Sequence, residues 1–452
     1  MKTTRILQIG DIHLPEWTAS EIDIDEKDAE FSKEIINDLK HSRLSQVLKG
    51  INKTANSGAI DAVFLMGDFT SYGKKEYVEP AMKIMDVLLQ DAGSTPRPQV
   101  FVVPGNHDVN REDAQALGTL GKFAHFRETA EKLGWASPPV EGACCYELAP
   151  RGSSGEPLAT ILVNSSIGSQ SLHTLAPAIE KCISESELGD GQPVEILSYD
   201  VLNGGSEAPD FGSAETSGQS LAEQRYRHLD TPYVSKEAMA NVIQASSSAS
   251  GGSILMCAHH NLLPQRVPRI SPYAEMLNAG FFRSALLDTN KNYIYLHGHI
   301  HDDPIEVIER PSERFGNIRS NAIVTISAPP IWQGYNEVAL FHDQSGDIFL
   351  VRVTLYRLNA SGFIGNFSDQ NTRFIPLVGR NEVLLSSKMI TLWDYLKANT
   401  RTFPEIEETV TGLKDDELEN ALMAIFCAGL IDIKNLGLAR HRWRITALED
   451  AK

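Results

Sequence analysis

Three short apolar runs near the start of the chain each end at a glycine that is followed by a polar side chain. The runs are 5–9, 62–66 and 99–103, and the side chains after their glycines are Asp11, Asp68 and Asn106. Helix-like apolar periods occupy 28–55 and 77–89 between these runs. Apolar strands separated by helices are typical of a layered α/β fold, and such sheets place ligands at their strand ends. The sequence therefore predicts an α/β fold with a functional site at one edge of a sheet.

Composition limits the class of protein and its partners. The 452 residues, 42% hydrophobic and 22% charged, suffice for one large globular domain and a smaller one. The first apolar run is too short for a secretory signal, and no later stretch reaches the roughly 20 apolar residues of a membrane helix, so we expect no membrane partner. The odd number of cysteines, five, indicates reduced thiols and a cytoplasmic location. A net charge of −18 disfavours nucleic acid as a partner unless a local basic patch is present.

Changes of pattern along the chain divide it into two expected domains. The α/β pattern extends over 1–358, and its later strands are expected at 253–257, 293–296, 322–326, 337–341 and 348–355. Residues 164–230 are rich in Ser and Gly and lack sustained apolar runs, which indicates a partly irregular insertion bordering the site. We expect 359–385 to be a linker.

Residues 386–452 have a different character. Helical periods at 390–396 and 413–427 precede two strand-like segments at 431–434 and 443–446, an order that resembles a winged helix, and they carry enough apolar residues for a separate small core. The segment holds nine Lys/Arg and eleven Asp/Glu, so it has no overall basic footprint. The clustered basic residues are Lys434, Arg440, Arg442 and Arg444. We favour protein contact or self-association over DNA binding for this domain.

Five short polar blocks occur in order along the chain. They are Asp11-Ile12-His13, Gly67-Asp68, Gly105-Asn106-His107-Asp108, His259-His260 and Gly298-His299-Ile300-His301. Each block alone is weak evidence for a site, since a lone Asn-His-Asp is usually a turn and a lone His is usually an ordinary, partly buried side chain. Together, and mostly at strand ends, they indicate one site.

The chemistry of these blocks suits divalent metals. Residues i and i+2 of an extended segment point the same way, so Asp11 and His13 can bind one ion, as can His299 and His301. A carboxylate can bridge two cations, which suits Asp68. Imidazole, carboxylate and amide oxygen together favour Mn, Fe, Zn or Co over calcium, and of these we favour manganese. The set has no thiolate, which argues against a structural zinc site.

The ordered set resembles the calcineurin-like metallophosphoesterase superfamily, whose blocks run Asp-x-His, Gly-Asp, Gly-Asn-His-Asp/Glu, His and Gly-His-x-His. The resemblance spans residues 11 to 301 and implies a two-layer β-sandwich flanked by helices. It implies two metals and their ligands: Asp11, His13 and His301 for one, Asn106, His259 and His299 for the other, and Asp68 between them. It also implies that His107 protonates the leaving oxygen and that a metal-bound hydroxide attacks the phosphoester.

Two adjacent histidines stand where the family has one. Neighbours on a strand point to opposite faces, so only one of them is readily a ligand. The similarity of His259-His260-Asn261-Leu262-Leu263-Pro264 to His-His-x-x-x-Pro-like forms favours His259 as the ligand. His260 is left to contact the substrate or to pack, and we assign it to the substrate.

The resemblance leaves the substrate class open. Gly67-Asp68-Phe69-Thr70-Ser71-Tyr72-Gly73 looks like the Gly-Asp-Leu-Thr-Asp-x-Gly of cyclic-nucleotide and glycerophosphodiester phosphodiesterases, with Ser71 replacing Asp. His259-His260-Asn261 also matches the His-x-Asn of double-strand-break-repair nucleases. We expect a phosphodiesterase, with a DNA or RNA nuclease and a non-catalytic regulatory or protein-binding module as alternatives. The intact ligand set argues against the last.

Overall fold

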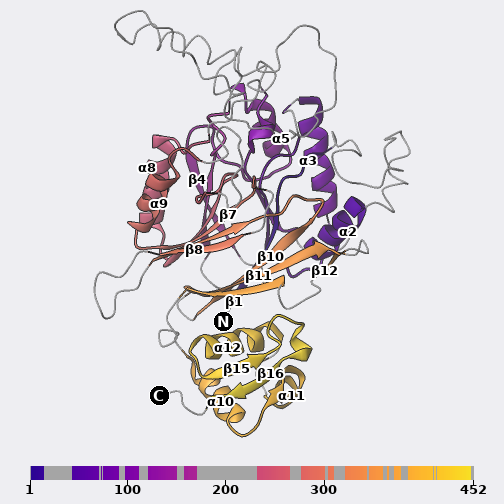
Figure 1. Cartoon of the computed structure of the whole chain (residues 1–452), viewed down its shortest axis with the longest axis vertical. Coiled ribbons are helices and arrows are strands. Elements are labelled where there is room, and N and C mark those ends of the chain that lie inside the picture. The colour runs from indigo at the N-terminus through magenta and orange to yellow at the C-terminus, as the bar shows by residue number, and fades with distance from the viewer. Residues whose placement is uncertain are drawn as a thin grey trace, which may run out of the picture.

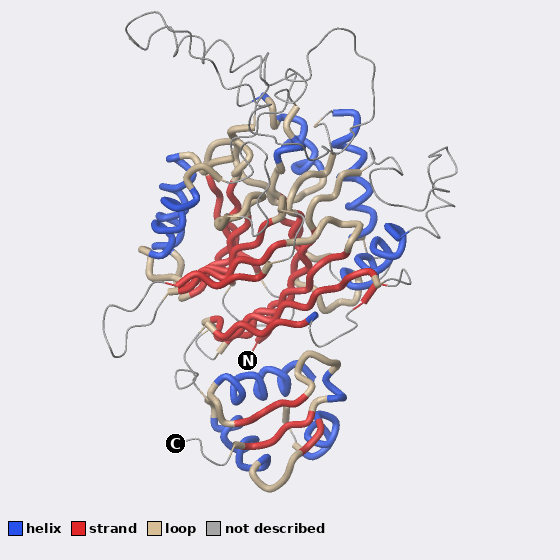
Figure 2. Tube along the Cα trace, in the orientation of Figure 1, coloured by secondary structure: helices blue, strands red, loops and turns tan. Residues whose placement is uncertain are grey.

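The computed structural model describes most of the chain. The described residues are 2–14, 43–70, 73, 75–90, 97–110, 121–149, 157–169, 232–264, 276–300, 304–309, 321–343, 346–359, 364–365, 371–377, 385–410, 412–413 and 415–448. Within them the strands form sheets of seven, six and three strands. The two larger sheets pack face to face between outer layers of helices, and the small sheet belongs to a separate C-terminal unit (Figure 1, Figure 2).

The first large sheet combines parallel and antiparallel strands in the order β12-β11-β10-β1-β2-β3. Its parallel strands are β1 (Lys2–Ile9), β2 (Ala62–Leu65) and β3 (Gln99–Val102). Its antiparallel strands are β10 (Gly334–His342), β11 (Ile348–Leu358), β12 (Ile364–Gly365) and β13 (Thr372–Pro376), which pairs with β11. Helices α2 (Arg43–Ala55), α3 (Lys75–Leu89) and α5 (Ala124–Lys132) pack on its outer face.

The second large sheet has the order β4-β5-β6-β7-β9-β8. Its four central strands are parallel: β5 (Leu158–Val163), β6 (Ser253–Cys257), β7 (Asn292–His297) and β9 (Ala322–Ser327). Its edges are the antiparallel strands β4 (Ala143–Leu148) and β8 (Ile305–Glu309). Helices α8 (Lys236–Ser248) and α9 (Ala279–Leu287) pack on its outer face.

A largely apolar core lies between the two large sheets. Phe64 of β2 stacks on Phe101 of β3 with ring centroids 4.7 Å apart, and both belong to one buried cluster with Leu255 and Leu296 of the second sheet. Central strands that are covered on both faces need apolar residues at every position, which explains the unbroken apolar runs of the sequence. The expected α/β sandwich flanked by helices is confirmed.

A buried polar network crosses this core directly behind the strand ends. The Gln8 amide nitrogen donates to the carbonyls of His297 (3.1 Å) and Ile326 (2.9 Å) on the second sheet. The Asn336 amide nitrogen donates to the Gln8 side-chain oxygen (3.0 Å) and to the Ser327 carbonyl (2.8 Å). Both side chains are fully buried, so these bonds fix the two sheets in one relative position.

The structure differs from the expected linker and leaves most of the expected insertion untested. The expectation of a linker over 359–385 does not hold for β12 and β13, which extend the first sheet because β11 offers a long edge that β13 pairs from Leu350 to Thr354. Most of the expected insertion, 170–230, lies outside the described residues, as does 28–42 of the first expected helix. None of the described helices is both long and apolar enough to cross a membrane.

The C-terminal unit has the order helix, strand, helix, helix, strand, strand. Its elements are α10 (Ser387–Leu396), β14 (Arg401–Thr402), α11 (Phe403–Thr409), α12 (Asp415–Cys427), β15 (Ile431–Lys434) and β16 (Arg444–Ala447). Strand β16 pairs with both β14 and β15. Sequence periodicity missed α11, which begins with a capping bond from the Thr402 backbone N–H to the Glu405 carboxylate (2.8 Å).

The core of the C-terminal unit is continuous with the outer face of the first sheet. Its apolar residues, including Leu418 and Leu422 of α12, form one cluster with Phe341 of β10 and with Phe349 and Leu350 of β11. Helix α12 thus covers part of the outer face of the first sheet, where it contacts β10, β11 and the N-terminal strand β1 (Figure 1). The expected separate core is replaced by a shared one, because the outer face of β10 and β11 is apolar and needs a cover.

Candidate metal centre

The strand ends of both large sheets bring the predicted ligands together at one edge of the sandwich. Strands β1, β2 and β3 lead to Asp11, Asp68 and Asn106, while β6 and β7 lead to His259 and His299. His301 lies outside the described residues. Contacts among the side chains of these strand ends show that the five polar blocks form one site.

The first group of ligands consists of Asp11, His13 and Asp68. One ligand atom from each lies within 4.8 Å of the others, and all three side chains are buried. Four of the seven described non-glycine residues with positive φ are predicted ligands: Asp11 (41°), His13 (48°), Asp68 (52°) and His299 (70°). Such backbone costs energy and collects at functional sites, which is the pattern here.

The second group centres on His259, whose hydrogen bonds define its tautomer. The Nδ1 atom lies 2.6 Å from the Met66 carbonyl, which can only accept, so Nδ1 carries a proton. In neutral His259 the Nε2 atom then has a lone pair and no proton. It nevertheless lies 3.1 Å from Asn106 Oδ1 and 3.3 Å from Asp68 Oδ2. His299 Nδ1 lies 3.2 Å from the same Asn106 oxygen. A proton or a metal ion between His259 Nε2 and these oxygens would relieve the close approach of their lone pairs.

The pKa shifts of His259 and Asp68 also favour positive charge at this position. Burial lowers the pKa of His259, but the Asp68 carboxylate outweighs burial and raises it to about 9. Burial raises the pKa of Asp68, but His259, His107 and His13 outweigh it and hold this pKa well below its usual value. Positive charge beside Asp68 is therefore favourable, either as a proton on His259 or as a metal ion, so the side chains present fit divalent cations.

Two glycines allow the loops to meet around Asp68. A Cβ on Gly105 would lie 2.0 Å from Asp68 Oδ1, and one on Gly67 (φ +93°) would lie 2.4 Å from the Gly105 nitrogen. This close approach lets the His107 backbone N–H donate to Asp68 Oδ1 (2.9 Å). On the other side, the His299 backbone N–H donates to the Asp11 carboxylate (3.1 Å). Backbone donors thus orient two of the predicted ligands.

Asp108 supports the site, although the sequence analysis gave it no role. Its carboxylate accepts from the Phe69 N–H (2.7 Å) and from the Gly105 N–H (2.9 Å), joining the loops after β2 and β3. It is buried, and burial together with the Asp68 charge raises the pKa of Asp108 to about 8. The sequence signal that could have identified Asp108 as a supporting residue was its position in the Gly-Asn-His-Asp block.

We expect Asp108→Asn to weaken metal binding by roughly 10- to 100-fold, because the amide offers only one acceptor to two backbone N–H groups. Metal titration of the folded apoprotein measures this loss. Asp347→Asn is the matched control, since the Asp347 carboxylate also accepts a backbone N–H, from Gly252 (2.7 Å), at the start of β6. Equal metal affinity in the two variants would contradict the role of Asp108.

His107 and Trp332 flank the first ligand group. The His107 ring is partly exposed, and its centroid lies 5.3 Å from that of His13. The Trp332 ring lies 6.4 Å from His13, next to Ile331, whose N–H donates to the Asp11 carbonyl (3.3 Å). Nothing in the local sequence distinguished Trp332, which follows a short loop after β9.

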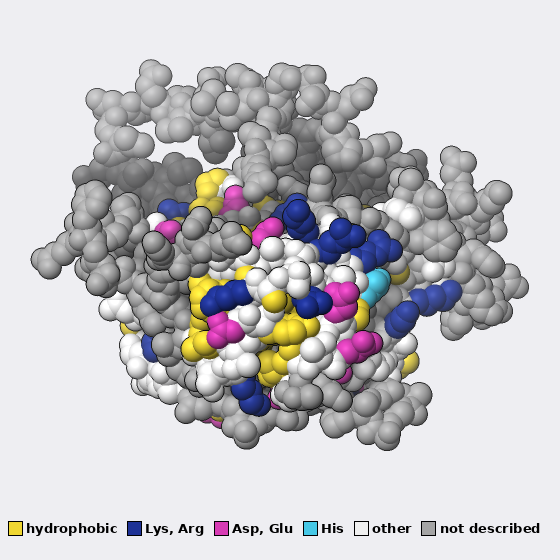
Figure 3. All heavy atoms as spheres, turned by 90° about the horizontal axis from the view of Figure 1, so that it is seen from below, with side chains coloured by type: hydrophobic (Ala, Val, Ile, Leu, Met, Phe, Trp, Pro, Cys, Tyr) yellow, Lys and Arg dark blue, Asp and Glu magenta, His cyan; other side chains and the backbone are white. Residues whose placement is uncertain are grey.

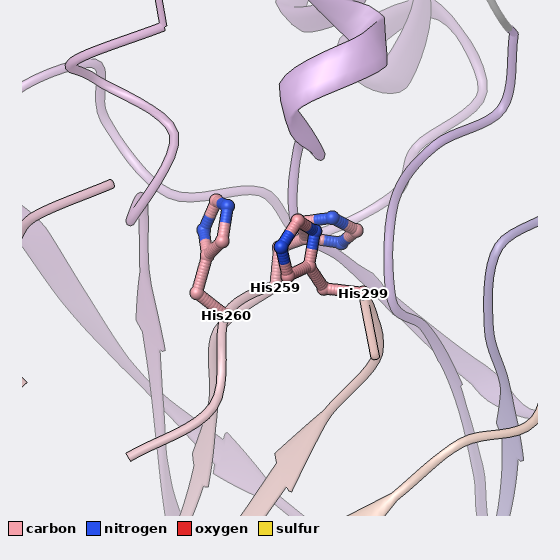
Figure 4. Close-up of side chains that lie close together, drawn as sticks. All are labelled: His259, His260 and His299. Atoms are coloured by element: carbon pink, nitrogen blue, oxygen red, sulfur yellow. The ribbon is translucent and has the colours of Figure 1, made fainter. Parts of the chain in front are cut away.

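His260 lies on the same side as His259, contrary to the expectation that neighbours point to opposite faces. The pair follows the end of β6 at Cys257 and lies in a bend, so strand alternation does not apply. The His260 ring centroid is 4.8 Å from that of His259 and 4.4 Å from that of His299 (Figure 4). The three histidines could together hold a metal ion by distance. Burial, with His299 nearby, lowers the pKa of His260 well below its usual value, so the ring is neutral.

Comparison with solved structures finds similar chains at low identity. A dimetal phosphatase from Danio rerio is 12% identical, with a TM-score of 0.42, and the match covers 83% of this chain and 99% of that one. The anchor protein of the Plasmodium inner membrane complex is 11% identical, with a TM-score of 0.39 and coverage of 83% and 89%. The calcineurin-like phosphoesterase YfkN from Bacillus subtilis is 12% identical, with a TM-score of 0.31 and coverage of 93% and 98%.

Comparison with protein families identifies the family of this chain. A search of curated proteins found no match. The family model of the calcineurin-like phosphoesterases matches residues 4–303, about two thirds of the chain, and this range contains all five polar blocks. The chain therefore belongs to the calcineurin-like phosphoesterase family.

Proposed function

We propose that this chain hydrolyses phosphodiesters with two divalent metal ions held on either side of Asp68. The observation that carries the proposal is the position of the Asp68 carboxylate. It belongs to the buried group with Asp11 and His13, and its Oδ2 atom also lies 3.3 Å from His259 Nε2. When bound, two such cations lower the pKa of a coordinated water and neutralise charge on the phosphoryl group. Manganese is the metal we favour, and His301 completes the first ligand set.

His107 is the proposed acid for the leaving oxygen. Its backbone N–H is held by Asp68, while its ring is partly exposed and stands beside His13. A ring placed in this way can reach an oxygen of a substrate bound between the two ligand groups. His107 is also available for this role, because the proposed metal ligands do not include it.

We expect His107→Ala to keep both metals and to lose roughly 10²–10⁴-fold in kcat on substrates with poor leaving groups. Substrates with activated aryl leaving groups need less protonation and should lose less. Turnover of an alkyl and an aryl diester by the same metal-loaded variant gives the comparison. A loss of equal size on both substrates would assign His107 to another role.

The preference for a diester depends on the segment 67–73. The Thr70 hydroxyl accepts from the Gly73 N–H (2.9 Å), and a Cβ on Gly73 would lie 2.1 Å from the Val109 carbonyl. The threonine and the final glycine of this phosphodiesterase-like block therefore shape the loop that carries Asp68. These two contacts support the likeness to the phosphodiesterase block, in which Ser71 replaces Asp.

A substrate panel tests the proposed reaction. The manganese-loaded protein is assayed against a bis-aryl phosphodiester, an aryl monoester, a mononucleotide, cyclic nucleotides, and single- and double-stranded DNA. We expect the highest kcat/KM on a small diester. Higher kcat/KM on the monoesters would overturn the diester preference, and preferential cleavage of DNA would favour the nuclease alternative.

For the C-terminal unit we propose a winged-helix-like domain that contacts protein rather than DNA. A DNA-binding winged helix places its third helix in the major groove. Here the third helix, α12, begins with Asp415, Asp416 and Glu417, and most of its side chains are buried. Figure 3 shows the face opposite the large sheets, where basic side chains lie beside an apolar area with acidic ones between them. Ile390 and Leu448 of this domain are exposed apolar side chains.

Two measurements test this assignment. We expect light scattering of the full chain to show self-association, or a partner to bind in a pull-down that Ile390→Ser weakens. DNA affinity should stay negligible at physiological salt, and Arg442→Ala with Arg444→Ala should leave it unchanged. Tight DNA binding that these substitutions weaken, with a salt slope flatter by roughly 0.9 per lost contact, would overturn the proposal.

The proposed location is a reducing cytoplasm. Cys144, Cys145, Cys257 and Cys427 are free thiols in the described part of the chain. Cys257 and Cys427 are buried, Cys144 is half-buried and Cys145 is exposed, and free thiols suit a reducing compartment.

A further inference from the structure

His260 has a complete set of hydrogen bonds on one side of its ring and none on the other. Its Nδ1 atom lies 2.9 Å from the Ser165 hydroxyl oxygen, and its backbone N–H donates to the same oxygen (3.1 Å). Its carbonyl accepts from the Tyr295 hydroxyl (2.7 Å). The Nε2 atom is fully buried and has no hydrogen-bond partner in the structure as described.

The Ser165 hydroxyl determines which nitrogen of His260 carries the proton. Its oxygen already accepts from the His260 backbone N–H, and its own hydrogen has only His260 Nδ1 as an acceptor among the described residues. If Nδ1 carried the proton, two N–H groups would point at one oxygen and the serine hydrogen would have no acceptor. The hydrogen-bonding groups on the Ser165 side of the ring are all satisfied only if Ser165 donates to Nδ1. The proton of the neutral ring then sits on Nε2.

The Nε2–H group faces the metal centre. Of the two ring nitrogens, Nδ1 is turned to Ser165, which leaves Nε2 on the side of His259 and His299 (Figure 4). An N–H group has no lone pair to offer a metal ion, so this tautomer does not act as a ligand. It is instead a buried donor with no acceptor among the described residues, and such a group is costly until a ligand supplies an oxygen.

We propose that Ser165 fixes His260 as the Nε2–H tautomer, so that His260 donates to a phosphoryl oxygen of the substrate instead of binding metal. This inference rests on the proposed function, since it names the oxygen that the donor meets. Ser165 is a positioning residue, and His260 is the residue that touches the substrate. Backbone bonds at both ends of His260 hold the ring in place before substrate arrives, which is the preorganisation that a site of this kind requires.

Metal content and phosphate binding test the role of His260. We expect His260→Ala to bind as much metal as the wild type and to bind inorganic phosphate roughly 10- to 100-fold more weakly, the loss typical of a hydrogen bond to a charged group. His260→Gln, whose amide nitrogen takes the place of Nε2, should recover most of this affinity. Loss of one metal ion in both variants would overturn the proposal in favour of a third histidine ligand.

A spectroscopic measurement tests Ser165 independently of activity. In zinc-loaded protein with ¹⁵N-labelled histidine, two-bond ¹H–¹⁵N spectra should show His260 as the Nε2–H tautomer. Ser165→Ala should abolish that single pattern and raise KM more than it lowers kcat. Ser166→Ala is the matched control, because Ser166 is equally buried but its hydroxyl donates to the Pro104 carbonyl (3.0 Å).

The outcomes separate this inference from the proposed function. Wild-type protein that binds two metals but no phosphate would defeat the phosphoryl acceptor and with it the proposal. Phosphate binding that His260→Ala leaves unchanged would overturn the inference while the phosphoesterase assignment stands. A Nδ1–H tautomer in the wild type would overturn the role of Ser165.

Discussion

Asp68→Asn is expected to lower kcat by at least roughly 10²-fold, the scale seen when one preorganised electrostatic group is lost from an active site. The physical reason is that Asp68 faces both ligand groups, and a neutral amide cannot bridge two cations. One amide position would also place an NH₂ group against the His107 N–H, which now donates to Asp68 Oδ1 (2.9 Å). Metal analysis should find at least one ion bound more weakly, while circular dichroism should show a native fold.

Asp61→Asn is the matched control for this experiment. Asp61 is a buried aspartate that directly precedes β2, and its carboxylate accepts from the Arg5 backbone N–H (2.7 Å). It therefore resembles Asp68 in burial and bonding but lies at the opposite end of the same strand. We expect the control to keep two metals and near-wild-type turnover. Two tightly held ions and full turnover in Asp68→Asn would remove Asp68 from the bridging position.

The strand ends were predictable because their signals are local. The apolar runs before Asp11, Asp68 and Asn106 mark β1, β2 and β3, and glycine between run and ligand marks a sharp turn. Apolar periodicity and the glycines that end a strand are properties of a few adjacent residues. The sequence alone therefore predicted the layered fold and the placement of the polar blocks at strand ends.

The sheet order and the support of the site were not predictable in this way. Strand β1 pairs with β10, so Lys2 lies opposite His342, and no local pattern announces a partner so distant. The same holds for Gln8 and Asn336, which look like minor interruptions of apolar strands and prove to join the two sheets. The orientation of His260 escaped prediction because strand alternation was applied past the end of β6.

Glu419→Ala is expected to lower the free energy of unfolding by about 3 kcal/mol, within the range for breaking a buried ion pair on one side. The Glu419 side chain is 2% exposed and pairs with Arg5 (3.3 Å), Arg440 (3.3 Å) and Arg352. Arg5 and Arg352 are themselves only 13% and 12% exposed. Removing Glu419 leaves Arg352 with Glu337 and leaves Arg5 with Glu337 and the more exposed Asp416. Denaturant unfolding followed by tryptophan fluorescence measures the loss.

Asp394→Ala is the control for that loss. Asp394 and Lys397 pair on α10 with side chains 59% and 48% exposed, and such surface pairs contribute roughly 0–1 kcal/mol. A loss for Glu419→Ala no larger than that of Asp394→Ala would mean that α12 is not anchored to the sheet by charge. We expect kcat of Glu419→Ala to remain near the wild type at temperatures where the protein is folded, because Glu419 touches no predicted ligand.

The shared core changes what truncation of the C-terminal unit would do. With the separate small core that the sequence analysis expected, a chain ending near residue 380 would keep its remaining domain unchanged. The structure shows that Phe341, Phe349 and Leu350 of the first sheet are buried against this unit. Exposing them would create an apolar patch on β10 and β11, and a patch of this kind favours aggregation. We therefore expect the truncated chain to lose stability and solubility even though every predicted metal ligand remains. Point substitutions such as Ile390→Ser test the domain's partners without uncovering the sheet.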